Sequence, residues 1–176
     1  GVNAIEYAAR VISFIQDLSW REEAQGVRLE GLDVPFSTIS TNMISGGNGK
    51  NIIPAECEFF FDYRYVPGKA PEAFIDSIRN YIAEHVEPRM KRSHPDAGVD
   101  LECTGSIPGL DPDEQSSITR LTQSLLRPRP SAKVAYGTEA GFFQQAGIPS
   151  IVCGPGSIEQ AHKPDEFVPL EQLVEC

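Results

Sequence analysis

The chain has 176 residues, of which 40% are hydrophobic and 23% charged, and its formal net charge is −10 at pH 7. This composition is typical of a globular protein, and the length allows one ordinary domain or two small ones. The negative charge argues against a nucleic-acid-binding protein, because contacts to phosphates need clusters of Lys and Arg. No apolar run approaches the roughly 18 residues of a membrane span, so we expect no transmembrane segment.

The first 51 residues predict a helix followed by the first arm of a hairpin. Apolar residues spaced three and four apart indicate an amphipathic helix over 2–18, and the polar stretch 19–36 is interpreted as a loop. Alternation over 36–43 predicts a strand, and the Gly-rich run 45–51 a wide turn. The side chains expected to face the core from the helix are Ile5, Ala8, Ala9, Ile12, Ile15 and Leu18.

The hairpin is expected to close with a strand over 56–66. Side chains alternate along a strand, so Asp62 and Arg64 should point to the same face. A helix over 71–90 and a short strand over 99–104 follow. The order is that of a βαββαβ unit that lacks only its first strand.

The second half predicts a different pattern. A Gly- and Pro-rich stretch, 105–112, is the best candidate for a linker. Helices are expected over 113–125, 142–146 and 169–174, and strands over 132–136 and 150–153. This alternation is typical of the last pieces of a larger α/β sheet.

Four cysteines, Cys57, Cys103, Cys153 and Cys176, are scattered and form no metal-binding pair. Cys57 and Cys153 fall in apolar segments, which predicts buried thiols in a reducing, cytoplasmic compartment.

The second predicted strand of this half leads into the loop 154–156, and His162 follows beside Asp165 and Glu166. A strand that ends in a Gly-rich loop with polar groups is where α/β folds place binding sites. An imidazole there can be a metal ligand or an acid/base, but a loop histidine is also commonly a solvated surface residue. Since catalytic zinc usually has three protein ligands, one histidine leaves both interpretations open.

The run GTEAGFFQQAGIPSIVCGPGSIEQAHKPDEFV, residues 137–168, resembles the C-terminal signature of the acetylornithine deacetylase group in the dinuclear zinc amidohydrolase and aminopeptidase family. The start GVNAI, the turn ISGG to NIIP and the strand end FDYRYVPG are similar to the same family. The resemblance implies an α/β protein with an α+β lid. Residues 1–106 would be part of a ferredoxin-like dimerisation domain without its first strand, and 107–176 the C-terminal part of the α/β catalytic domain.

The resemblance also implies roles for single residues. His162 matches the last metal ligand, in a site with two zinc ions, or cobalt. Arg64 suits a substrate carboxylate, although an ion pair with Asp62 is the alternative, and Asn51 can equally cap its turn. Glu139 suits the cationic side chain of ornithine. The residues matched to substrate contacts are Asn51, Arg64, Thr138, Glu139, Gly154, Pro155 and Gly156.

The implied activity is hydrolysis of N-acetyl-L-ornithine to ornithine and acetate, a step of arginine biosynthesis, by a homodimer paired through the lid. A succinyl-diaminopimelate desuccinylase or another N-acyl amino acid hydrolase is the alternative, and a non-catalytic dimerisation module is an alternative of another class. The general base and the other metal ligands of the family lie upstream of the matched segments. We therefore expect a fragment that has no catalytic residue of its own and is inactive alone.

Overall fold

The computed structural model describes all residues except 127–132, 135 and 162, and it contains both helices and strands. The chain divides into two compact units. Unit 1 comprises 1–30 and 34–106, and unit 2 comprises 31–33 and 107–176. Identifying these units with a lid and with part of a catalytic domain stays a prediction. No helix among the described residues is long and apolar enough to cross a membrane.

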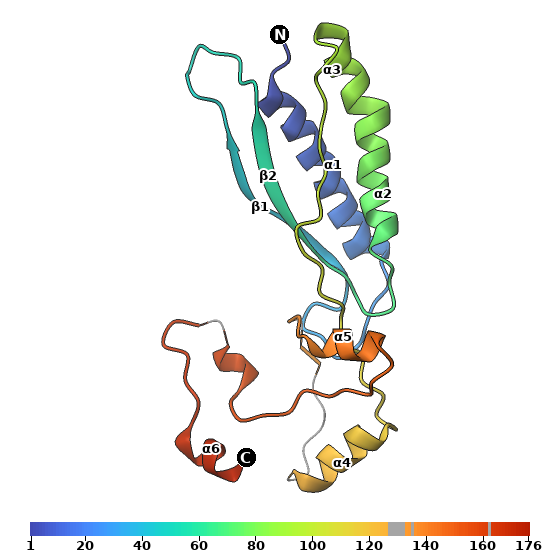
Figure 1. Cartoon of the computed structure of the whole chain (residues 1–176), viewed down its shortest axis with the longest axis vertical. Helices are drawn as coiled ribbons and strands as arrows, with labels where there is room; N and C mark the ends of the chain where they lie inside the picture. The colour runs from blue at the N-terminus through green and yellow to red at the C-terminus, as the bar shows by residue number, and fades with distance from the viewer. Residues whose placement is uncertain (127–132, 135, 162) are drawn as a thin grey trace. The chain divides into compact units, whose positions relative to one another are not determined.

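Unit 1 is a two-stranded antiparallel hairpin with helices on one face (Figure 1). Its elements are α1 (Ala4–Gln25), β1 (Thr38–Gly46), β2 (Cys57–Arg64), α2 (Glu72–Tyr81), the π-helical turn η1 (Ile82–Val86) and α3 (Glu87–Ser93). The helices and the inner face of the hairpin share one hydrophobic core. Its buried members are Val11, Ile15, Ile39, Phe74, Ile78, Ile82, Val86 and Met90.

Helix α1 is longer than predicted, and its predicted core face is confirmed only in part. The loop expected from residue 19 begins only at Gly26, because 19–25 contain neither Gly nor Pro to end the helix. The buried side chains are Ala8, Val11 and Ile15. Of the residues expected in the core, Ala8 and Ile15 are buried and Leu18 packs against the core. Ile5, at 38%, and Ala9 are exposed. Apolar residues occur around much of the helix, so spacing alone could not fix the edges of the buried face.

The hairpin prediction is confirmed. Thr38 lies opposite Arg64 and Gly46 opposite Cys57, with a β-bulge between Thr41 and Met43. Exposure alternates along β2, so the face that begins at Cys57 packs inward and the face that carries Arg64 lies outward. On the inner face the Tyr63 ring lies 4.1 Å from the Phe74 ring of α2, which joins the hairpin to the helix layer.

The helix expected over 71–90 contains one wide turn. The backbone N–H of Glu87 donates to the Ile82 carbonyl, a bond that spans five residues in place of four. The next residue is Pro88, which has no N–H to donate to the Glu84 carbonyl. In a regular α-helix its ring would also clash with the Glu84 carbonyl oxygen. π-turns often interrupt α-helices as single bulges, and this proline gives a local reason for one here.

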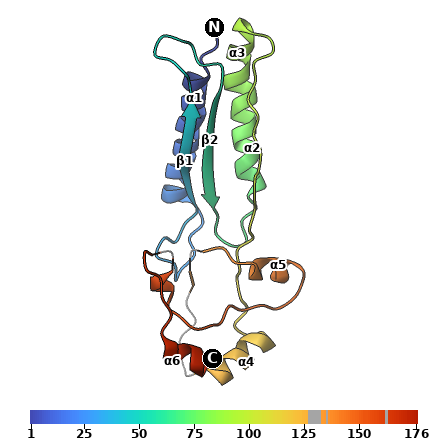
Figure 2. The ribbon, with the colours of Figure 1, turned by 60° about the vertical axis from the view of Figure 1, so that its left-hand side comes forward.

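The strand predicted over 99–104 is wrong. Ala97, Val99 and Leu101 pack against the core, and the intervening residues are exposed, so the segment has the burial pattern of a strand. Figure 2 shows it running back along α2, outside the sheet. A strand forms only when its backbone bonds a neighbouring strand. Here the backbone N–H of Val99 instead donates to the Glu87 side-chain carboxylate at 3.2 Å.

A half-buried polar cluster joins the C-terminal part of α1 to the turn after β2. Lys69 Nζ donates to Glu22 Oε2 at 2.5 Å, and the N–H of Val66 donates to the buried Ser37 hydroxyl at 3.3 Å. The buried Tyr63 hydroxyl makes no hydrogen bond with any described residue. Burial raises the pKa of Tyr63. Desolvation lowers the pKa of Lys69, but the hydrogen bond to Glu22 and the nearby charges outweigh it, so that pKa is raised.

We expect this cluster to lose its stabilising effect in alkaline solution. Raised pKa values mean that the folded state favours the protonated groups. Their contribution is complete below the usual values, near about pH 10, and is lost as pH rises through the raised values. Urea unfolding followed by circular dichroism should give a free energy of unfolding that falls between about pH 9 and 12, less steeply for Tyr63→Phe. The same slope for Tyr63→Phe as for the wild type and the control Tyr7→Phe would contradict this.

The described part of unit 2 has short helices and few buried side chains. Its elements are α4 (Ser117–Leu125), α5 (Ala140–Gln145), the 3-10 turn η2 (Ile158–Gln160) and α6 (Leu170–Glu175). Helix α4 starts later than residue 113, because the Ser116 side chain caps it by accepting from the N–H of Thr119. Helix α5 is held to the segment before α4. Gln144 bonds both the N–H and the carbonyl of Asp111, at 3.0 and 2.5 Å.

The strands predicted in unit 2 are not observed. Residues 150–153 belong to no strand, with Val152 62% exposed, and the expected burial of Cys153 is wrong because that thiol is exposed. Of 132–136, the described residues 133, 134 and 136 are also outside any strand. Parallel strands form only within a sheet whose faces are covered, and the described part of this unit offers no neighbouring strand.

Candidate functional site

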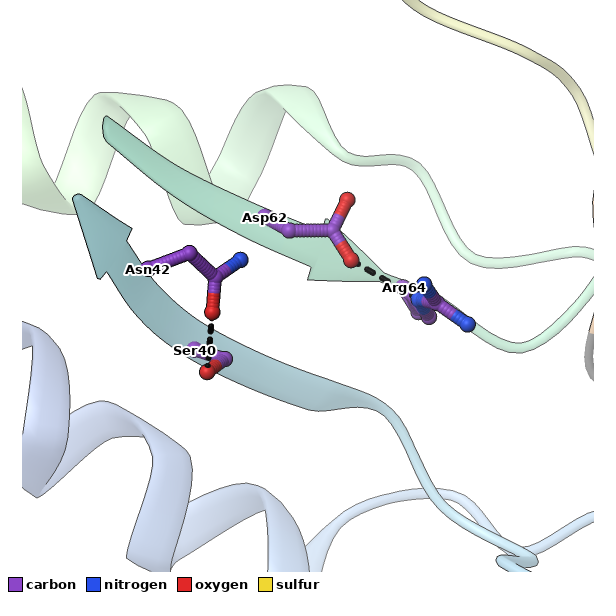
Figure 3. Close-up of polar contacts among 4 residues, drawn as sticks. All are labelled: Ser40, Asn42, Asp62 and Arg64. Atoms are coloured by element: carbon purple, nitrogen blue, oxygen red, sulfur yellow. Dashed lines mark hydrogen bonds and ion pairs between the residues drawn. The ribbon is translucent and has the colours of Figure 1, made fainter. Parts of the chain in front are cut away.

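Arg64 ends β2 on the outward face of the hairpin (Figure 3). Its Nε donates to Asp62 Oδ2 at 2.7 Å, as alternation along the strand predicts, and both side chains are about half exposed. Ser40 lies opposite Asp62 in β1, and its hydroxyl donates to Asn42 Oδ1 at 2.7 Å. The β2 end therefore presents an oriented guanidinium among polar side chains, an arrangement suited to an anionic group such as a carboxylate.

Asn51 lies in the connection between β1 and β2 and is exposed. This connection is joined to the start of α1, where the N–H of Ala4 donates to the Pro54 carbonyl at 3.1 Å. Among the described residues no hydrogen bond of the Asn51 side chain is found, so its amide is presented to solvent. The Gly-rich turn places it six residues before Cys57, the first residue of β2.

Unit 1 does not bring Asn51 and Arg64 together. They lie before the start and at the end of β2, and the eight residues of this strand span about 23 Å. Helix α1, which runs beside the hairpin, gives a similar length. Its Ala4 bonds the Pro54 carbonyl near one end of the hairpin, and its Ser19 bonds the Ile39 carbonyl near the other. These two helix residues are about 22 Å apart along the axis. A substrate as small as one amino acid cannot touch both side chains of the same chain.

In unit 2, Thr138 and Glu139 form the start of α5. The Thr138 hydroxyl accepts from the N–H of Ala140 at 2.9 Å, which orders the first turn. Glu139 occupies the N-cap position, makes no cap bond with its side chain and is exposed. Gly141 follows, buried against the chain, because a Cβ there would lie 2.1 Å from the Pro108 carbonyl oxygen. The helix start is thus fixed, with the Glu139 carboxylate directed outward.

The loop Gly154–Pro155–Gly156 is held at its last residue. Gly154 and Pro155 are exposed, but Gly156 is half-buried with a φ of +106°, a conformation that favours glycine. Its N–H donates to Gln172 Oε1 of α6 at 2.7 Å. Neither this glutamine nor Gln144 was predicted, because a neutral side chain that bonds distant backbone carries no local signal.

His162, the predicted metal ligand, lies outside the described residues. Among the residues that are described, no three His, Cys, Asp or Glu side chains come together as a metal site would require. His85 and His94 are exposed, and His85 Nε2 lies 3.9 Å from Glu84. The described donor set therefore does not hold zinc by itself.

Comparison with known proteins matches both halves of the chain. The profile described as peptidase dimerisation domain matches residues 1–90, and the profile of the peptidase family M20/M25/M40 matches residues 56–176. The second match covers more than half of the chain. The chain belongs to the M20/M25/M40 peptidase family. Members of this family are hydrolases that generally depend on a metal, usually zinc.

This M20-family chain is similar to several proteins named acetylornithine deacetylase. It is 30% identical to that of Myxococcus xanthus over all of its own length and 44% of the relative's. It is 35% identical to that of Erwinia tasmaniensis and 32% to that of Photorhabdus laumondii, over 96% and 97% of its own length and 42% of theirs. The chain thus spans less than half the length of these relatives.

Proposed function

We propose that the chain is part of a metal-dependent amide hydrolase that removes the acetyl group from N-acetyl-L-ornithine. The observation that carries this is the similarity, along nearly the whole chain, to relatives that bear the name acetylornithine deacetylase. Arginine biosynthesis is the pathway that the activity would serve. As the chain spans under half the length of these relatives, the activity belongs to the full-length protein.

The substrate contacts follow from the chemistry of the exposed groups. The Arg64 guanidinium would bind the α-carboxylate through two parallel hydrogen bonds, and its pairing with Asp62 fixes the direction in which it points. The exposed Glu139 carboxylate would attract the cationic ornithine side chain. Thr138 and the loop of Gly154, Pro155 and Gly156 would form the rim of the pocket.

We also propose that His162 supplies one ligand to a site for two zinc ions, with the remaining ligands outside this chain. When bound, zinc supplies an activated water and polarises the amide carbonyl. The residues of this chain would bind and orient the acyl amino acid.

The separation of Asn51 from Arg64 favours a site completed by a second copy. In a homodimer paired through unit 1, one chain would provide Arg64 and its partner Asn51 for the same substrate. The match of residues 1–90 to a dimerisation domain supports this pairing. A site of this kind would be inactive in the monomer.

A ferredoxin-like fold for unit 1 is part of the same proposal. One edge of β2 has no strand neighbour among the described residues, and the segment 97–102 has the burial pattern of a strand without a ladder. A strand inserted between them would satisfy both and produce a four-stranded sheet. The backbone N–H of Val99 would then donate to the inserted strand in place of the Glu87 carboxylate.

The test is hydrolysis by the full-length, zinc-loaded protein. N-acetyl-ornithine, N-succinyl-diaminopimelate and a neutral N-acetyl amino acid should be offered at equal concentration. We expect kcat/KM to be highest for N-acetyl-ornithine, by about tenfold or more, because Glu139 would complement its side chain. A preference for the succinyl substrate would reassign the protein to the desuccinylases. Dimers by size exclusion with no hydrolysis of any substrate would favour a pairing module.

A further inference from the structure

The C-terminal segment contacts the Gly154–Gly156 loop in two ways. The N–H of Gly156 donates to Gln172 Oε1 at 2.7 Å, across 16 residues of sequence. On the same residue, an added Cβ would lie 3.0 Å from a methyl carbon of Val168. Gly156 is therefore contacted by the Val168 methyl group and by the Gln172 acceptor. Its positive φ and the absence of a side chain make both contacts possible.

The first turn of α6 determines where the Gln172 side chain lies. Pro169 occupies the N-cap position, and the N–H of Gln172 donates to the Pro169 carbonyl at 3.1 Å. With its backbone held in this turn, Gln172 is half-buried and its amide oxygen reaches the loop. By contrast, Gly154 has open space around its Cα. The loop is thus held at one end and open at the other.

We infer that Gln172 is a positioning residue, which fixes the loop that the proposed function places at the rim of the substrate pocket. This inference rests on that function for its catalytic consequence, but not for the contact itself. A backbone N–H held by a neutral amide keeps one direction at every pH. Loss of the acceptor would release Gly156 and let the loop sample other conformations. A smaller fraction of the molecules would then have the loop in the position that binds substrate.

The test compares three substitutions in the full-length, zinc-loaded protein. Gln172→Glu keeps an acceptor oxygen at the same reach, Gln172→Met keeps the length without a strong acceptor, and Gln172→Asn keeps the amide but is one methylene shorter. We expect kcat/KM to fall about tenfold for Met and Asn and to stay near wild type for Glu. Gln123→Met, at an exposed position of α4, is the matched control. Wild-type kcat/KM for both Met and Asn would overturn the inference.

A second readout separates this inference from the proposed function. Hydrogen exchange at the Gly156 amide, measured by NMR on the same proteins, should be about tenfold faster in Gln172→Met and Gln172→Asn than in the wild type or Gln172→Glu. Unchanged exchange would show that the contact does not hold the loop, whatever the substrate is. If the wild type hydrolyses nothing, the proposed function fails while the exchange data still decide on the contact. Because Asn adds no apolar surface, it keeps the test valid if the Met variant folds poorly.

Discussion

Alanine at Arg64 should lower kcat/KM for N-acetyl-ornithine by about a hundredfold or more in the full-length protein. The guanidinium is the cation on the outward face of β2 that Asp62 orients at 2.7 Å, and truncating one partner of a charge-assisted pair typically has an effect of this size. Lysine keeps the charge but not the planar fork, so Arg64→Lys should lose about tenfold. Steady-state kinetics give both values.

A substrate without its carboxylate makes this test specific. If Arg64 binds the α-carboxylate, its replacement should have little further effect on the carboxamide analogue of N-acetyl-ornithine. Arg79→Ala is the matched control, since Arg79 forms a similarly exposed pair with Asp76 on α2. Equal losses on the acid and on the carboxamide would show that Arg64 has a structural role and does not bind the carboxylate.

The second large effect is recovery of activity in mixed dimers. If one chain supplies Asn51 and the other Arg64, then Asn51→Ala and Arg64→Ala should each keep less than about a tenth of the activity. Heterodimers of the two variants should recover about half of the wild-type activity, because each would contain one intact site of two. The measurement is the specific activity of dimers purified through a different tag on each variant.

A double variant provides the control for this recovery. Asn51→Ala mixed with the combined Asn51→Ala/Arg64→Ala chain leaves no site with both side chains, so it should show no recovery. Mixed dimers no more active than their parents would mean that both groups act from one chain or that Asn51 does not contact substrate. The separation of about 23 Å along β2 argues against the first of these.

The hairpin of unit 1 could be predicted because its signals are local. Alternation over the β2 segment correctly placed Asp62 and Arg64 on one face, and the Gly-rich run correctly indicated a turn. The buried face of α1 could be predicted only in part: Ala8 and Ile15 are buried as expected, but Ile5 and Ala9 are exposed. Apolar residues around much of the helix left the exact face to the sheet and to α2. Local pattern predicts an element; packing determines which side of it is buried.

The strands predicted after residue 98 show a second limit. The segments 99–104 and 150–153 have apolar residues suitable for strands, yet neither has a hydrogen-bonded neighbour in the described structure. Strand character depends on partners that a sequence pattern does not contain. For the site, the predicted Arg64 was placed by strand alternation, whereas Gln172 became visible only through its contact with Gly156.

The wide turn η1 affects which side of α2 and α3 faces the core. The buried residues Phe74, Ile78, Ile82, Val86 and Met90 are spaced by four throughout. In a regular α-helix each such step advances about 40° beyond a full turn, so the drift over the set would reach about 160° and turn Met90 away from the core. A turn closed over five residues at Ile82–Val86 takes up much of this drift. The π-turn thus keeps a single apolar seam along three consecutive helical elements, and a sequence spacing of four becomes compatible with one continuous core.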